Sequence, residues 1–207
     1  MSREFIKLKV ESFLRIFMKR KILLGLTTTS QSDWRAKVKE IDEFNIREIA
    51  LFPTCLKIEE RKELYKLLES TKLESIPHVH LRGEDMEEWE LDFLVNRYGT
   101  KFFNIHPNIE DSEVLGFVKY CEMIYVENLH DAGDVFLQSL KKCAGICFDT
   151  SHYEDYGAIQ KIHDYDNFLE ILKQNKVGCC HISAVVTEPL EDTDYISGDK
   201  TQSYSRH

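Results

Sequence analysis

The 207-residue chain has no apolar stretch long enough to span a membrane. It also has no excess of positive charge, because 27 Lys and Arg residues stand against 36 Asp and Glu residues and give a net charge of −9. An acidic total gives no support for a broad nucleic-acid-binding face, although it is compatible with a local basic patch at a cleft. The length suits one domain with a full hydrophobic core.

The six cysteines lack the spacing of a zinc finger. Cys143 and Cys147 are separated by three residues, and Cys179 and Cys180 are adjacent. Three of these cysteines lie inside apolar runs that resemble strands. We therefore expect reduced core cysteines in a cytoplasmic protein.

The first 20 residues mix apolar and basic side chains too evenly for a signal peptide, which needs an uninterrupted apolar region and a small-residue cleavage site. One reading is a basic amphipathic helix on the barrel bottom or on a membrane surface. The other, which we favour, is that translation naturally starts at Met18 and that the preceding segment is not native. The domain itself is expected to span residues 21–207, after an N-terminal extension at residues 1–20.

Seven short apolar runs alternate with segments of helical periodicity. This alternation predicts an α/β fold with parallel strands, and the number of repeats favours a (β/α) TIM barrel. Strands are expected at residues 22–26, 47–52, 75–81, 101–105, 123–127, 145–149 and 177–182. Helices are expected at residues 33–44, with Asp33 as the N-cap, and at 58–68, 87–97, 111–120, 133–142 and 167–174, while residues 150–165 are expected to form a long polar loop.

The eighth βα unit is missing from this pattern. Residues 184–207 are polar and turn-rich, with no apolar run and no closing helix. A complete barrel typically needs about 250 residues. We therefore expect seven visible βα units and a gap between the seventh strand and the first, in a barrel that is either naturally open or, as we favour, truncated.

Several of the apolar runs end at residue types that bind metal ions. Side chains at the carboxyl ends of parallel strands converge on one mouth, where a barrel enzyme keeps its chemistry. On the third run a period of two places His78, His80 and Arg82 on one inward face, which favours metal or phosphate binding, and either His78 or His80 is expected to complete a metal site. His106 precedes Pro107, which stops the fourth strand and leaves the imidazole at the rim.

Two carboxylates end otherwise apolar runs. An unpaired carboxylate at Glu127 would be costly, so it is expected to face a cation as a ligand or catalytic group. In the segment Asp149-Thr150-Ser151-His152, the aspartate and the histidine can reach one ion or two neighbouring ions. His181 repeats the strand-end pattern on the seventh run.

The set of ligand types indicates which ions the site would hold. Neutral imidazoles with carboxylates suit Zn²⁺, Mn²⁺ or Fe²⁺ rather than Mg²⁺ or Ca²⁺, which prefer oxygen ligands. Four or more histidines with two carboxylates exceed the needs of one tetrahedral ion. The sequence therefore predicts at least two divalent ions, and paired ions suit phosphoester hydrolysis.

The order of these residues resembles the xylose-isomerase-like TIM barrels, and in particular the endonuclease IV type of apurinic/apyrimidinic endonuclease. In that type a trinuclear zinc cluster cleaves the phosphodiester beside an abasic site. The resemblance implies catalytic roles for Glu127, Asp149 and His181, with Glu127 bridging metals. It implies the metal ligands His78, His106, Glu127, Asp149, His152, His181 and His207, and the substrate contacts His80, Arg82, Asn128 and Arg206.

The chain departs from the family at three places. The endonucleases have Asp-x-His where this chain has Ser205-Arg206-His207, so one carboxylate ligand is missing. The strand-eight glutamate of the related sugar isomerases is absent, and the loops after the first two strands are short. These departures weaken the substrate assignment more than the metal assignment. From the ligand set we expect hydrolysis of a phosphoester, with abasic-site DNA as the family's substrate. The alternatives are a one-metal isomerase or epimerase acting on a sugar or sugar phosphate, and a non-catalytic barrel with a vestigial site.

Overall fold

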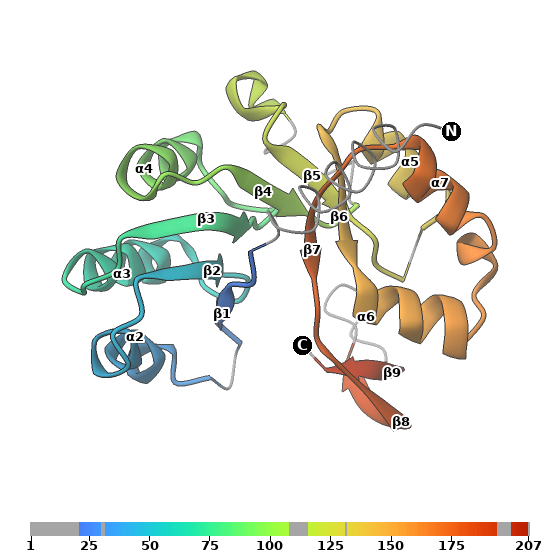
Figure 1. Ribbon diagram of the computed structural model, residues 1–207, viewed down its shortest axis with the longest axis horizontal. Coiled ribbons are helices and arrows are strands. Elements are labelled where there is room, and N and C mark those ends of the chain that lie inside the picture. The colour runs from blue at the N-terminus through green and yellow to red at the C-terminus, as the bar shows by residue number, and fades with distance from the viewer. Residues whose placement is uncertain (1–20, 30–31, 108–115, 131, 194–199, 207) are drawn as a thin grey trace, which may run out of the picture.

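The computed structural model describes residues 21–29, 32–107, 116–130, 132–193 and 200–206. Seven strands form one all-parallel sheet, in which the spatial order follows the chain order (Figure 1). The strands are β1 (Leu24–Thr27), β2 (Glu48–Phe52), β3 (Ser75–His80), β4 (Phe102–Ile105), β5 (Ile124–Glu127), β6 (Gly145–Asp149) and β7 (Val177–His181). Each expected run coincides with one of these strands to within two residues at either end, so the strand predictions are confirmed. The expected extension at residues 1–20 lies outside the described residues.

The sheet curves into a half-barrel. The ring of Phe52, at the end of β2, lies 4.9 Å from the ring of His181, at the end of β7. These two strands are far apart in the order of the sheet, so their ends meet across its concave interior. Within the described residues, β1 and β7 have no further parallel partner and form the two edges.

Helices follow the strands and lie along the outside of the half-barrel (Figure 1). They are α2 (Trp34–Glu43), α3 (Ile58–Glu69), α4 (Glu88–Tyr98), α5 (Asp134–Leu140) and α7 (Phe168–Gln174). In α2 the predicted cap is present, since the Asp33 carboxylate accepts the amide hydrogen of Ala36 at 3.0 Å. The same helix buries Trp34, Val38 and Ile41 on one face, as the helical period requires. None of the described helices combines the length and apolar character needed to cross a membrane.

The expected polar loop at residues 150–165 is helical instead. It contains α6 (Thr150–His152), the π-helical segment η3 (Tyr153–Ile159) and the short η4 (His163–Tyr165). The reason is local capping followed by aromatic packing. The Oδ1 atom of Asp149 accepts the amide hydrogens of Ser151 and His152, and the Tyr165 ring lies 5.1 Å from Phe168.

Residues 111–115 of the helix expected at residues 111–120 lie outside the described residues. In its described part only a 3₁₀ turn, η2 (Val118–Tyr120), is present.

The C-terminal residues form a separate hairpin that the sequence did not predict. Strands β8 (Ala184–Thr193) and β9 (Lys200–Arg206) pair antiparallel as a two-stranded sheet and do not join the parallel sheet. The hairpin packs on η3, where the backbone amide of Tyr204 donates to Asp155 at 2.8 Å. Among the described residues no eighth strand pairs with β1, in agreement with the expected gap.

Candidate metal centre

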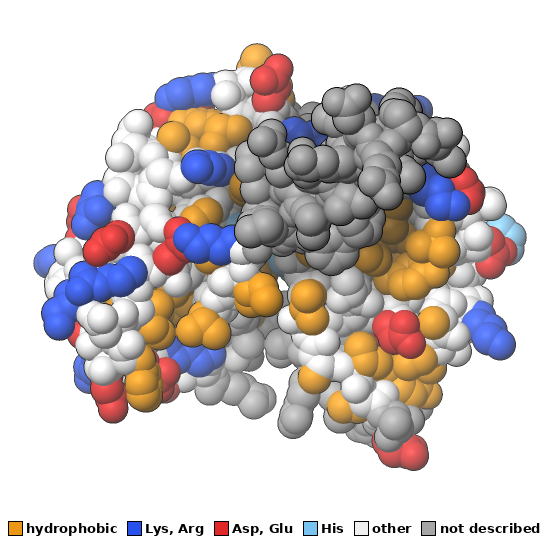
Figure 2. Space-filling view, viewed as in Figure 1, with side chains coloured by type: hydrophobic (Ala, Val, Ile, Leu, Met, Phe, Trp, Pro, Cys, Tyr) orange, Lys and Arg blue, Asp and Glu red, His pale blue; other side chains and the backbone are white. Residues whose placement is uncertain are grey.

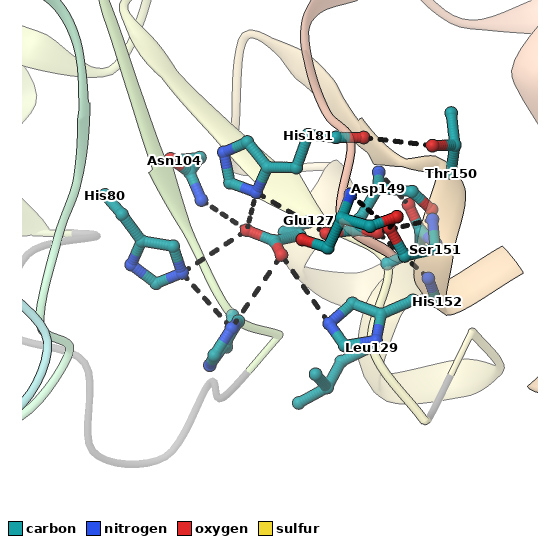
Figure 3. A network of polar contacts seen from close by, with 12 residues as sticks. His80, Asn104, Glu127, Leu129, Asp149, Thr150, Ser151, His152 and His181 are labelled. Carbon is teal, nitrogen blue, oxygen red and sulfur yellow. Dashed lines mark hydrogen bonds and ion pairs between the residues drawn. The ribbon is translucent and has the colours of Figure 1, made fainter. Parts of the chain in front are cut away.

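The Glu127 carboxylate is the centre of a cluster of imidazoles at the carboxyl ends of the strands (Figure 3). It is 2% exposed. Its Oε2 atom lies 3.3 Å from Nε2 of His80 and 3.2 Å from Nδ1 of His181. Its Oε1 atom lies 3.8 Å from Nε2 of His152 and 4.0 Å from Nε2 of His106. Four imidazoles from different parts of the sheet edge therefore face one buried carboxylate.

These separations suit divalent ions. Ligand atoms bound to one tetrahedral ion at about 2.0–2.1 Å lie about 3.3 Å from one another. The two shorter distances to Glu127 match this spacing, and the two longer ones need only small side-chain rotations. Two groups of ligand types meet at Glu127, each with one ligand atom per residue within 4.8 Å of the others. These groups are His80, His106 and Glu127, and Glu127, Asp149 and His152.

An unsatisfied buried oxygen at this cluster fits a bound cation. The Asp149 side chain is fully buried, and its Oδ1 atom is occupied by two backbone amides. Among the described residues, Oδ2 of Asp149 has no hydrogen-bond partner, and Nδ1 of His181 lies 3.7 Å from it. A buried carboxylate oxygen without a hydrogen bond is costly, and a metal ion is one of the few groups that compensates it. The donor set and this oxygen therefore fit a divalent ion.

The charges of the cluster are mutually dependent. Burial alone would raise the pKa of Glu127, but His181 and His80 outweigh it and hold that pKa well below its usual range. Burial would lower the pKa of His181, but the Glu127 and Asp149 carboxylates raise it. Desolvation and the neighbouring His80 lower the pKa of His106, whose Nε2 edge faces His80 at 3.1 Å although its side chain as a whole is 46% exposed. His106 is thus neutral near pH 7, which is the form that binds metals.

Of His78 and His80, the structure brings His80 to the Glu127 cluster. His80 lies beside Glu127 and 3.1 Å from His106 between their Nε2 atoms. His78 bonds through Nε2 to the Asn104 side chain at 2.8 Å. It occupies the next inward position on the same face of β3 and lies one layer below the mouth.

Arg82 does not reach the cluster as expected. It lies beyond the end of β3, and its guanidinium bonds Asp85 at 2.8 Å, Glu84 at 2.7 Å and the backbone carbonyl of Thr54. Through these contacts Arg82 connects the loop after β2 to the loop after β3. No contact between Arg82 and the histidines of the cluster occurs among the described residues.

Asn128 positions another residue instead of facing a substrate. Its side chain is fully buried, donates to the backbone carbonyl of Asp149 at 2.9 Å and accepts the amide hydrogen of Asp149 at 2.8 Å. It therefore fixes the end of β6 against the end of β5. Arg206 belongs to β9, but its side chain lies outside the described part of the structure, as does His207.

Sequence reasoning missed Asn104 and Phe52. The buried Asn104 amide donates to Oε2 of Glu127 and bonds His78, so it joins two layers of the site. Its signal was a polar side chain inside an apolar run, two residues before His106 and hence on the same face. The Phe52 ring packs against three imidazoles of the interior, but a strand-end phenylalanine gives no such signal in sequence.

The chain was compared with protein-family models, with curated proteins and with solved structures, and no match was found.

Proposed function

We propose that this chain is a divalent-metal-dependent enzyme on a xylose-isomerase-like (β/α) TIM barrel, and that it hydrolyses a phosphoester bond. The seven sequential parallel strands support this architecture. The ligand types cluster at the carboxyl ends of those strands, which is the catalytic end of such barrels.

One observation carries the proposal: Glu127 belongs to both groups of potential ligands. A carboxylate shared by two groups of ligands can bridge two ions, and two ions about 3.5–4 Å apart suit in-line displacement at phosphorus. When bound, such ions supply an activated water and stabilise the leaving oxygen.

The protein residues hold this arrangement in place. Asn104 donates to Oε2 of Glu127 and thereby fixes the rotation of the carboxylate. Asn128 and the first amides of α6 hold Asp149 so that its Oδ2 atom remains free for a ligand role. Such supporting contacts typically change metal affinity or activity by about 10–100-fold when they are removed.

The second candidate is a one-metal isomerase or epimerase acting on a sugar or sugar phosphate. Arg82 favours it, because Glu84 and Asp85 already neutralise the guanidinium that was expected to receive a phosphate. The net charge of −9 also disfavours a long polyanionic substrate. The two proposals predict different numbers of ions and different substrates, so they can be separated.

The test uses the full chain loaded with Zn²⁺ or Mn²⁺ and a duplex with one abasic site. Nicking is expected, and Glu127→Gln is expected to abolish it because the bridging charge is lost. The matched control is Glu154→Gln, which makes the same change at an exposed carboxylate two residues beyond His152 and should retain activity. Turnover of a ketose or ketose phosphate without nicking would favour the isomerase. Full loading without either reaction would indicate a vestigial site.

A further inference from the structure

A second group of potential ligands lies one inward layer below the Glu127 cluster. Cys147 is two residues before Asp149 on β6, and Cys179 is two residues before His181 on β7, so they share the inward face. The two cysteines are direct partners in the register of these strands. Cys147 and His78 both lie beside the Cys179 thiol. Ligand atoms of His78, Cys147 and His181 lie within 4.8 Å of one another.

The hydrogen bonds of Asn104 determine which ring nitrogen of His78 carries the hydrogen. The ionised Glu127 carboxylate can only accept, so Asn104 turns its Nδ2 to Glu127 and its Oδ1 to His78. That oxygen accepts from the protonated Nε2, which leaves the lone pair of His78 on Nδ1. Metal-binding histidines are oriented in the same way, with the second ring nitrogen donating to an oxygen.

His181 gives an independent indication of a ligand at this level. Its side chain is 8% exposed and presents Nδ1 to Glu127 and Asp149. Its Nε2 atom is buried and has no hydrogen-bond partner within the described residues. The His181 ring lies only 5.0 Å from the His78 ring. Its unbonded Nε2 atom is therefore suited to bind an ion below the mouth.

We propose that His78, Cys147 and His181, with Cys179 beside them, form a site for a thiophilic divalent ion such as Zn²⁺, one layer below the Glu127 centre and sharing His181 with it. Two thiolates and two imidazoles form a common tetrahedral zinc set, with bonds of about 2.0–2.3 Å. Such ligand atoms lie about 3.3–3.8 Å apart, so small side-chain rotations bring His78, Cys147 and His181, whose ligand atoms lie within 4.8 Å of one another, to this spacing. On binding, the two thiol protons pass to solvent, and no oxidation or reduction occurs.

This site would have a structural consequence. It would connect β3 to β6 and β7, which face one another across the interior of the half-barrel. The proposal goes beyond the proposed function, because it holds whether or not the Glu127 centre hydrolyses a phosphoester.

X-ray absorption at the zinc edge tests the proposal on the full chain loaded with Zn²⁺. We expect a sulfur shell at about 2.3 Å in addition to nitrogen and oxygen. The shell should disappear in the double variant Cys147→Ser/Cys179→Ser and persist in Glu127→Gln. Cys180→Ser is the matched control, because the adjacent position points to the other side of β7. A shell of nitrogen and oxygen alone in the unchanged protein would overturn the proposal.

A second variant keeps the test decisive if the double serine variant misfolds, because this second variant leaves the proposed ligands unchanged. It replaces the other four cysteines with serine, namely Cys55, Cys121, Cys143 and Cys180, which are all partly or largely exposed. The sulfur shell should remain with two sulfur neighbours. Its loss in this folded variant would show that the zinc was bound elsewhere and would contradict the assignment.

Discussion

The buried Arg61–Glu90 pair allows a stability prediction with a defined magnitude. Arg61 on α3 and Glu90 on α4 are both 0% exposed. All five guanidinium hydrogens have acceptors: two bonds of 2.8 Å to Glu90, and three to Asp85 and Leu56 at 2.8–2.9 Å. Tyr65 adds a further bond of 2.8 Å to Glu90. The pair thus joins two helices and fixes the loop after β3.

Removing one partner leaves the other charge buried. Arg61→Met and Glu90→Gln should therefore each lower the free energy of unfolding by about 3–5 kcal/mol, out of a typical total of about 5–15 kcal/mol. The double variant Arg61→Met/Glu90→Gln removes both charges and leaves only neutral groups unpaired. It should cost no more than either single variant, so the coupling between the two positions should be about 3–5 kcal/mol.

Urea unfolding followed by circular dichroism measures these free energies for the four proteins of the cycle. The dependence of the free energy on urea should be the same for all four, because the surface exposed on unfolding does not change. Costs that add within about 0.5 kcal/mol would refute the reasoning, since independent sites behave in that way. A loss below about 1 kcal/mol in Arg61→Met would refute it equally.

Three further predictions concern single positions. Burial alone would raise the pKa of Asp85, but two arginines lower it. The Asp85 carboxylate therefore contributes stability above its unfolded pKa of about 3.9, and this contribution is lost as the pH falls through the lower folded pKa. Asp85→Asn should flatten the pH dependence of the unfolding free energy below about pH 4. Gly145→Ala should lower the free energy of unfolding in urea by more than about 2 kcal/mol, because Gly145 has a φ of +153° and a Cβ there would lie 2.2 Å from the carbonyl oxygen of Lys176. A Cβ at Gly116 would meet no atom within 4 Å, so Gly116→Ala should be tolerated. The buried hydroxyl of Tyr98 has no hydrogen-bond partner among the described residues, so Tyr98→Phe should leave the melting temperature unchanged or raise it, and Tyr65→Phe, which loses a buried bond, should lower it.

The sequence was sufficient to place all seven strands of the parallel sheet. Strands covered on both faces appear as continuous apolar runs, and their polar ends mark the mouth. The side chains brought together at Glu127 were found for the same reason, because His106, Asp149, His152 and His181 all lie at or just beyond strand ends. Local pattern and topology together therefore predict the position of the cluster.

Other features depend on contacts between distant residues. The choice between His78 and His80 depends on how far each lies along the strand axis, and Asn104 settles it through bonds to two other strands. The helical segment after β6 depends on its tyrosines packing onto Phe168, although tyrosine-rich polar sequences resemble loops. The C-terminal hairpin likewise depends on the buried Asp155, whose carboxylate accepts a hydrogen bond from the backbone amide of Tyr204.

The central claim is that Glu127 bridges two divalent ions. Anomalous diffraction from a crystal soaked in Mn²⁺ tests it most directly, because Mn²⁺ prefers nitrogen and oxygen ligands and avoids the cysteine layer. Two anomalous peaks about 3.5–4 Å apart are expected, one beside each oxygen of the Glu127 carboxylate. A fully soaked crystal without a peak in contact with Glu127 would contradict the account, and a single peak there would contradict the two-ion centre.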